Sequence, residues 1–387
     1  MNKKELELYI HIPFCVRKCS YCDFLSAPAT EQTREAYMAA LFAEIGGRAK
    51  DYSDRTVTSI FIGGGTPSLL SGEQIGQLMD RIREQFAMAQ DAEITMEVNP
   101  GTASAEKLRN FYTAGINRLS IGMQSAQAEE LKNLGRIHDF EGFCQVYREA
   151  VEAGFTNINV DIMSGLRGQA LASYRDTLEK VLHLEPMPQH ISAYSLIVEE
   201  GTPFAAMAER GELPLPEEET ERAMYEETIE VLAKYGFHRY EISNYARDGY
   251  ECRHNVGYWI RRDYLGFGIG AASLIDNVRF QNEKSLGAYL AHPLESREEE
   301  QTLTVQDRME ETMFLGLRLT RGVSCVDFAE QYGRTVEEVY GEVIARNVAD
   351  GLLTVTERKE NQKKDRLLAL TKRGLDLSNY VMAQFLF

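Results

Sequence analysis

The sequence predicts an α/β protein, built as a parallel sheet with a smaller, mainly helical domain after it. Short apolar segments alternate with amphipathic helical ones from the N-terminus to about residue 200. The apolar segments have the composition of strands and lie at residues 5–12, 57–65, 93–100, 116–124, 157–166 and 190–198. Strands separated by helices at this spacing are typical of βαβ units, which form parallel sheets. Such units make either an incomplete barrel or a doubly wound open sheet, and the periodicity does not separate these two.

Two of the intervening helices carry terminal signals. Residues 71–88 begin with Ser71 and Gln74, which stand three apart in the arrangement of a capping box. Residues 104–115 end in Gly115, and glycine is favoured just after a helix because it adopts left-handed dihedrals. Both signals predict helices that connect neighbouring strands.

The second half of the chain has a different character. Residues 212–221 are rich in proline and glutamate, which predicts a surface turn that leads into a helix. Aromatic residues and glycines crowd the segment 238–273. Helical patterns follow at residues 305–319, 325–332 and 336–349, and 351–371 has the pattern of two short strands around a polar loop. A helical unit that ends in a hairpin is compatible with a winged-helix-like domain.

The composition is that of a globular protein and argues against a nucleic-acid-binding or a membrane-spanning protein. The 387 residues are 44% hydrophobic and 26% charged, enough for two domains with substantial cores. The net charge of −17 argues against a nucleic-acid partner, because phosphate backbones bind basic surfaces. No apolar stretch approaches the ~20 residues that span a bilayer. We therefore expect a cytoplasmic protein, for which membrane association can be only peripheral and cysteines are thiols or metal ligands.

Cys15, Cys19 and Cys22 lie just after the first predicted strand, in a Cys-x3-Cys-x2-Cys spacing. Three thiolates do not complete a tetrahedral zinc site, although His11 or a distant cysteine could supply a fourth ligand. A 4Fe-4S cluster held by three cysteines leaves one iron open for an exchangeable ligand, and we favour this interpretation over zinc. Buried structural thiols are the least favoured alternative, since three cysteines this close in one loop would make an unusual core.

Polar residues follow several predicted strands at their carboxyl ends. The second strand ends in the glycine turn 63–65, which taken alone is more simply a tight βα turn than a ligand site. Glu97, Gln124 and Asp161 end three later strands, and Arg136 follows one helix further on. Because ligand sites of parallel α/β folds lie at this edge of the sheet, we expect these groups to share one site above the cysteine loop.

The run from Tyr9 to Phe24, YIHIPFCVRKCSYCDF, resembles the cluster loop of radical-SAM proteins. The resemblance is to the branch that contains oxygen-independent coproporphyrinogen oxidases and HemW-type haem chaperones. It implies a 4Fe-4S cluster on three cysteines, with S-adenosylmethionine chelating the fourth iron and cleaved on reduction to a 5′-deoxyadenosyl radical. It also implies a partial (β/α)6 barrel over residues 1–238 and a HemN-type C-terminal domain over residues 239–387.

The same resemblance assigns the polar residues at the strand ends. In this family the matching positions surround S-adenosylmethionine, and the glycine turn approaches it closely. The contacts implied for this chain are Tyr9, Tyr21, Gly64, Gly65, Thr66, Glu97, Gln124, Arg136 and Asp161.

Two places separate the oxidases of this branch from the haem chaperones. Phe24 stands two residues after the third cysteine, where the oxidases carry a fourth cysteine, so the loop matches the chaperones. The segment 254–259 contains the chain's only tryptophan and, taken alone, is most simply a packed aromatic turn. Histidine is also a common axial ligand of haem iron, and flat rings suit a porphyrin face. The segment matches the HNxxYW motif of the chaperones, which implies haem binding by His254, Asn255, Tyr258 and Trp259.

Two functional classes remain open at this point. One is a chaperone that binds haem and passes it to an acceptor, of which a respiratory protein is one example. The other is a radical oxidoreductase that acts on a porphyrinogen. Phe24 and the segment 254–259 favour the chaperone. Cys252 is a less favoured alternative as iron ligand, and Cys144 and Cys325 have the pattern of core residues.

Overall fold

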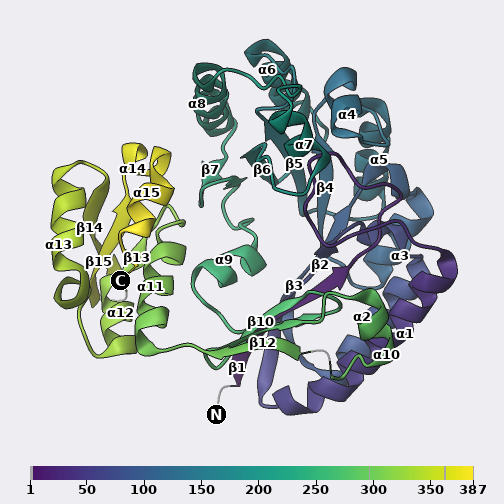
Figure 1. Ribbon diagram of the computed structural model, residues 1–387, viewed down its shortest axis with the longest axis horizontal. Coiled ribbons are helices and arrows are strands. Elements are labelled where there is room, and N and C mark those ends of the chain that lie inside the picture. Colours follow the sequence, from purple (N-terminus) through teal and green to yellow (C-terminus); the bar gives the residue numbers. More distant parts are fainter. Residues whose placement is uncertain (1–2, 296, 361–362, 387) are drawn as a thin grey trace.

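Over residues 3–295, 297–360 and 363–386, which the computed structural model describes, the chain forms a twelve-stranded sheet and a three-stranded sheet (Figure 1). The centre of the large sheet is a parallel run in chain order: β1 (Lys4–Ile12), β2 (Arg55–Gly64), β3 (Ala87–Val98), β4 (Arg118–Gln124), β5 (Ile158–Ser164) and β6 (His190–Ser195). β1 and β6 pair with other strands rather than with each other, so the barrel stays open. The predicted partial barrel is confirmed.

Helices between these strands cover one face of the sheet (Figure 1). They are α1 (Glu31–Arg48), α2 (Gly72–Gln85), α3 (Ala105–Thr113), α4 (Ala128–Leu134), α5 (Phe140–Glu152) and α6 (Leu171–Leu182), with 3-10 turns at Ala49–Tyr52, Pro67–Leu69 and Pro100–Thr102. Two more helices, α7 (Pro203–Glu209) and α8 (Glu218–Lys234), follow β6. Residues alternate between the two faces of a strand. In β1, Leu6, Leu8 and Ile10 join the buried apolar core, whereas Glu7 and Tyr9 point to the opposite, inner face, which is polar.

The predicted helix starts are confirmed, and one predicted helix end is wrong. Ser71 Oγ accepts from the Gln74 amide (3.1 Å) and Gln74 Oε1 accepts from the Ser71 amide (2.9 Å), which completes the capping box. The helix predicted over residues 71–88 ends at Gln85, because residues from Ala87 onward pair with β2. Gly115 has the left-handed conformation (φ +93°) that its place after α3 requires.

Short strands that the sequence did not predict extend the sheet on both sides. β9 (Tyr264–Phe267) runs parallel to β1, and β10 (Ala272–Ile275), β11 (Val278–Asn282) and β12 (Arg297–Thr302) continue antiparallel beyond it. β8 (Asn244–Ala246) and β7 (His238–Arg239) lie beyond β6. Two further helices, α9 (Arg253–Trp259) and α10 (Leu286–Ala291), belong to this part. The sheet thus continues past residue 238, and the domain boundary predicted there stays a prediction.

The C-terminal residues form a separate small core, built around Met313, Phe328 and Val381. Its elements are α11 (Val305–Gly316), β13 (Val323–Ser324), α12 (Cys325–Tyr332), α13 (Val336–Ala349), β14 (Leu353–Glu360), β15 (Lys363–Leu370), α14 (Lys372–Asp376) and α15 (Ser378–Ala383). The sheet order is β13-β15-β14, so a helix, a short strand, two helices and a hairpin follow one another as in a winged helix. Among the described helices, none has both the length and the apolar character needed to cross a bilayer.

Candidate functional site

A cavity of about 320 Å³ lies at the carboxyl ends of the parallel strands, between the strand ends and the cysteine loop. Because side chains alternate, the inner-face residue at the end of each strand points into the same space. Its lining includes Glu97 of β3, Gln124 of β4, Asp161 of β5 and Tyr194 of β6. Every residue that the sequence assigned to the cluster or to S-adenosylmethionine lines this cavity, apart from Tyr9, which lines a neighbouring one.

The cysteine loop is held over the cavity by backbone contacts. The Ser20 amide donates to the Leu134 carbonyl (3.1 Å), at the end of α4, and Arg17 donates to the Gly135 carbonyl (2.7 Å). Thr66 Oγ1 donates to Cys15 Sγ at 3.4 Å, and Arg136 donates to Cys19 Sγ at 3.8 Å. Hydrogen bonds from charged or hydroxyl donors stabilise sulfur that carries negative charge. The surroundings of these sulfurs therefore suit thiolates.

The three thiols do not converge on one point. Among the described residues, no group of three His, Cys, Asp or Glu side chains lies close enough together to hold a metal ion. His11, the alternative fourth ligand for zinc, is used elsewhere: its Nε2 donates to the Leu25 carbonyl (2.8 Å), so Nδ1 accepts from the Tyr9 hydroxyl (3.0 Å). This arrangement disfavours a mononuclear zinc site. A cubane cluster needs only one thiolate at each of three corners.

The glycine turn brings β2 against the start of the cysteine loop. Gly64 has φ +109°, and a Cβ there would lie 2.5 Å from the His11 ring. The Gly65 amide donates to the Ile12 carbonyl (2.8 Å), and a Cβ at Gly65 would lie 2.7 Å from the Phe14 carbonyl oxygen. The turn therefore needs glycine for packing as well as for any approach to a ligand.

Burial raises the pKa of two carboxyl groups in the cavity, those of Glu97 and Asp161. Burial, with the nearby Asp161, raises the pKa of Glu97 to about 8, although the Gly64 amide donates to Glu97 Oε2 (3.1 Å) and opposes the shift. Burial also raises the pKa of Asp161, against hydrogen bonds from Asn159 (2.7 Å) and Ser120 (3.3 Å). Ionising both of two close carboxyl groups in a buried site has a high free-energy cost, because burial and the like charge each disfavour the carboxylate.

Arg136 is a buried cation of this cavity, which Arg17 and Lys18 also line. One Nη donates to the Gly122 carbonyl (2.7 Å), while its buried Nε has no hydrogen-bond partner among the described residues. A buried donor without a partner is costly, so the site suits a ligand that brings an acceptor. Tyr194 donates to Gln124 Oε1 (3.0 Å), and Gln124 itself has φ +70°. Sequence reasoning missed Tyr194, although the alternation of β6 would have placed it on the inner face.

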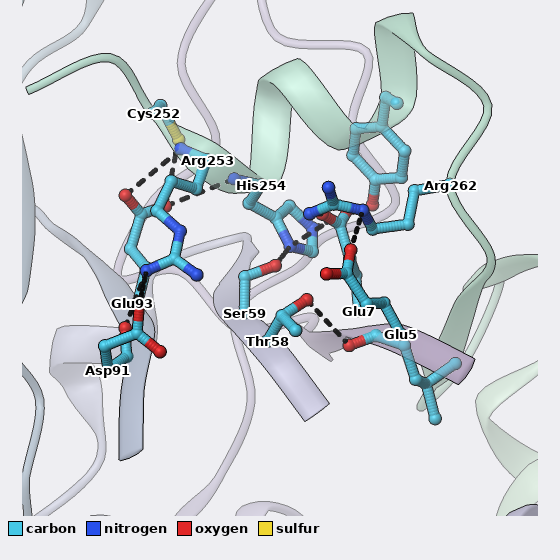
Figure 2. Close-up of polar contacts among 12 residues, drawn as sticks. Glu5, Glu7, Thr58, Ser59, Asp91, Glu93, Cys252, Arg253, His254 and Arg262 are labelled. Carbon is cyan, nitrogen blue, oxygen red and sulfur yellow. Dashed lines mark hydrogen bonds and ion pairs between the residues drawn. The ribbon is translucent and has the colours of Figure 1, made fainter. Parts of the chain in front are cut away.

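His254 lies in the first turn of α9, buried against the inner face of the sheet (Figure 2). The Glu93 carboxylate of β3 accepts from the backbone amides of Arg253 (3.1 Å) and His254 (3.2 Å). The His254 ring is hydrogen-bonded at Nδ1 to Ser59 Oγ (2.9 Å) and at Nε2 to the Tyr258 hydroxyl (3.1 Å). Burial lowers the pKa of His254 to about 3, so the ring is neutral. His254 is thus a packed, hydrogen-bonded residue in the structure, as expected for a segment that packs as an aromatic turn.

The other residues of the segment differ in their surroundings. Tyr258 and Trp259 line a second cavity, of about 690 Å³, which shares Phe24, Gly64 and Glu97 with the first. Asn255 lines neither cavity. Cys252 is fully buried, its Sγ lies 3.5 Å from Glu93, and burial raises its pKa to about 12, so it is a protonated thiol. This environment disfavours Cys252 as an iron ligand.

Comparison with known proteins agrees with this geometry. Residues 9–181 match the Radical SAM superfamily, and residues 303–377 match the HemN C-terminal domain. The chain is 38% identical to the heme chaperone HemW of Bacillus subtilis over 385 residues, 98% of each chain. It is 35% identical to HemW of Lactococcus lactis over 387 residues (100% of this chain, 98% of that one) and 37% identical to HemW of Escherichia coli over 358 residues (90% and 92%).

A solved structure matches over the whole length. It is coproporphyrinogen III oxidase (HemN) from Escherichia coli, described as a radical SAM enzyme, with a TM-score of 0.84 and 26% identity. The match covers 100% of this chain and 91% of that chain. Radical-SAM proteins use a 4Fe-4S cluster and S-adenosylmethionine, which agrees with the cysteine loop and the polar cavity beneath it. The chain belongs to the radical SAM superfamily and, within it, to the HemW family.

Proposed function

We propose that the protein is a haem chaperone, which binds haem and transfers it to an acceptor protein, and which carries a 4Fe-4S cluster and S-adenosylmethionine. The observation that carries this proposal is the 35–38% identity, over nearly the full chain, to relatives named heme chaperone HemW. Phe24, at the position where the oxidases carry a fourth cysteine, supports the same conclusion. A cytoplasmic location and a respiratory acceptor are parts of the proposal.

Cys15, Cys19 and Cys22 are the proposed ligands of the cluster. Their support is the shared cavity and the donors that face two of the sulfurs. When bound, the cluster supplies the electron that cleaves the sulfonium of S-adenosylmethionine. The residues of this chain place a hydroxyl donor beside Cys15 and a guanidinium beside Cys19.

S-adenosylmethionine is proposed to occupy the rest of the same cavity. Its carboxylate is an acceptor of the kind that the unpartnered Nε of Arg136 requires. With its pKa raised to about 8, Glu97 favours the protonated form, in which it can donate a hydrogen bond as well as accept one. The full set proposed to contact it is Tyr9, Tyr21, Gly64, Gly65, Thr66, Glu97, Gln124, Arg136 and Asp161. Haem is proposed to involve the segment that contains His254, Asn255, Tyr258 and Trp259.

Anaerobic reconstitution followed by haem titration tests the proposal on one sample. Iron and sulfide analysis should give about four of each per chain, and haem should then bind saturably with a Soret band at roughly one equivalent. Haem-loaded protein should pass its haem to an apo-acceptor on mixing. Haem uptake that never saturates would contradict the proposal.

The second candidate is a radical oxidoreductase acting on coproporphyrinogen III. The fold similarity to HemN supports it, and the exposed Phe24 in place of a cysteine opposes it. The oxidase reaction would appear as anaerobic, reductant-dependent loss of coproporphyrinogen III by a cluster-loaded sample. Turnover together with absent haem binding would favour this candidate over the chaperone.

A further inference from the structure

We propose that haem lies in the 690 Å³ cavity between α9, the β9–β11 edge and α11, and that His254 acts from behind its wall as a positioning residue rather than as the iron ligand. The inference rests on the proposed haem-binding function and adds the place of binding. It assigns one wall of the site to the C-terminal unit, because Phe314 and Leu315 of α11 line the cavity.

The cavity has the size and the surface that a flat macrocycle needs. Ligand pockets commonly measure about 300–1,000 Å³ and are mostly apolar with few polar groups. One wall is aromatic, formed by Tyr258 and Trp259 of α9 and Tyr264 of β9. Apolar side chains of α11 and β10 line the cavity as well. Tyr258 and Tyr264 pack edge to face, with ring centroids 4.6 Å apart, so the two rings support each other in this wall.

A surplus of positive charge lies at one end of the cavity. Glu311 of α11 accepts from Arg261 Nε (2.8 Å) and pairs with Arg279 of β11 (2.8 Å). Two guanidinium groups therefore share one carboxylate, in a chain whose net charge is −17. Arg279 and Glu311 both line the cavity. A propionate of haem would balance the remaining charge and suits the fork geometry of arginine.

His254 cannot reach iron as it stands. Its side chain is 1% exposed, it does not line the cavity, and both ring nitrogens already have partners, Ser59 and Tyr258. Phe61 stacks on the ring at 5.3 Å, and the Glu7 carboxylate lies 3.8 Å from Nδ1. Iron ligation would require the loss of the contact with Tyr258. The His254 ring instead holds the hydroxyl of Tyr258 through a hydrogen bond, and Tyr258 forms part of the cavity wall.

Cavity-filling variants test the location. Ala272 lines the cavity and is exposed, so Ala272→Trp should fold normally while occupying the space for haem. Leu315→Trp fills the cavity from the α11 side. We expect each to weaken haem binding at least about tenfold, with iron, sulfide and S-adenosylmethionine binding retained. Val348→Trp, exposed on the C-terminal unit and away from the cavity, is the matched control and should bind as wild type.

Two variants of His254 test its role. His254→Ala should weaken haem binding by freeing Tyr258, and His254→Gln should recover the binding, because glutamine can keep a hydrogen bond to the Tyr258 hydroxyl. In both, the Soret position and the spin state of ferric haem should equal those of wild type. A changed Soret band or spin state in His254→Gln would overturn the positioning role.

The outcomes separate the two proposals. If wild type shows no saturable haem binding, the proposed function fails. If wild type binds but Ala272→Trp and Leu315→Trp bind equally well, the function stands and the proposed location is wrong.

Discussion

Gly257→Ala should destabilise the protein although it replaces a helical glycine with the best helix former. Gly257 lies in α9, and a Cβ at this position would lie 1.9 Å from Glu7 Oε1. Glu7 is fully buried and its Oε1 accepts a hydrogen bond from Arg262 (3.3 Å), so its carboxyl group has little room to move (Figure 2). Overpacking of this kind costs about 1–3 kcal/mol, whereas alanine in a helix contributes up to about 1 kcal/mol.

The matched control is Gly76→Ala in α2, where a Cβ would meet no atom within 4 Å. It should raise stability by about 0.5–1 kcal/mol. Because both substitutions gain this helix term, they should differ by the overpacking cost, about 1–3 kcal/mol in the free energy of unfolding. Urea unfolding followed by circular dichroism measures the difference. Equal stabilisation by both substitutions would refute the close packing of α9 on β1.

Two other predictions concern charge and the cluster. Burial raises the pKa of Glu7 to about 8, above its ordinary value of 4.5, so the folded state holds a proton that the unfolded state releases. Stability should therefore fall as the pH rises from about 4.5 to about 8, and Glu7→Gln should flatten this part of the profile in thermal unfolding; an unchanged slope would contradict the shift. Cys19→Ser should abolish reconstitution of the cluster, measured as iron and sulfide per chain, whereas Cys144→Ser, in α5 and outside the cavity, should retain both. Equal iron in the two variants would contradict the proposed ligand set.

The parallel part of the fold was predictable because its signals are local. The capping box at Ser71 and the alternation of apolar and polar residues in β1 each lie within one element. The strands β9 to β12 were not predicted because they are only four to six residues long; β9 contains a glycine, and β12 has no apolar residue. Their placement depends on pairing with β1, from the other end of the chain.

The first cavity was predictable and the second was not. Strand ends of a parallel sheet meet at one edge, so Glu97, Gln124 and Asp161 could be placed together from the sequence. The second cavity depends on α11 lying near α9 and the strands β9 to β11, and the buried pair of Arg261, just after α9, and Glu311 of α11 joins the two helices. A contact between residues so far apart in sequence leaves no periodic signal.

Phe24 lies between the two cavities. It occupies the position where the oxidases carry a fourth cysteine, so its side chain decides what chemistry is available there. Its side chain is 59% exposed and lines both cavities. A thiol there could ligate a metal or take part in electron transfer, whereas a phenyl ring offers only apolar contact. The boundary between the proposed cofactor site and the proposed haem site is therefore chemically inert on this side. Haem held beyond Phe24 would lie next to the cluster without a ligating side chain at position 24, as suits a protein that releases its cargo unchanged.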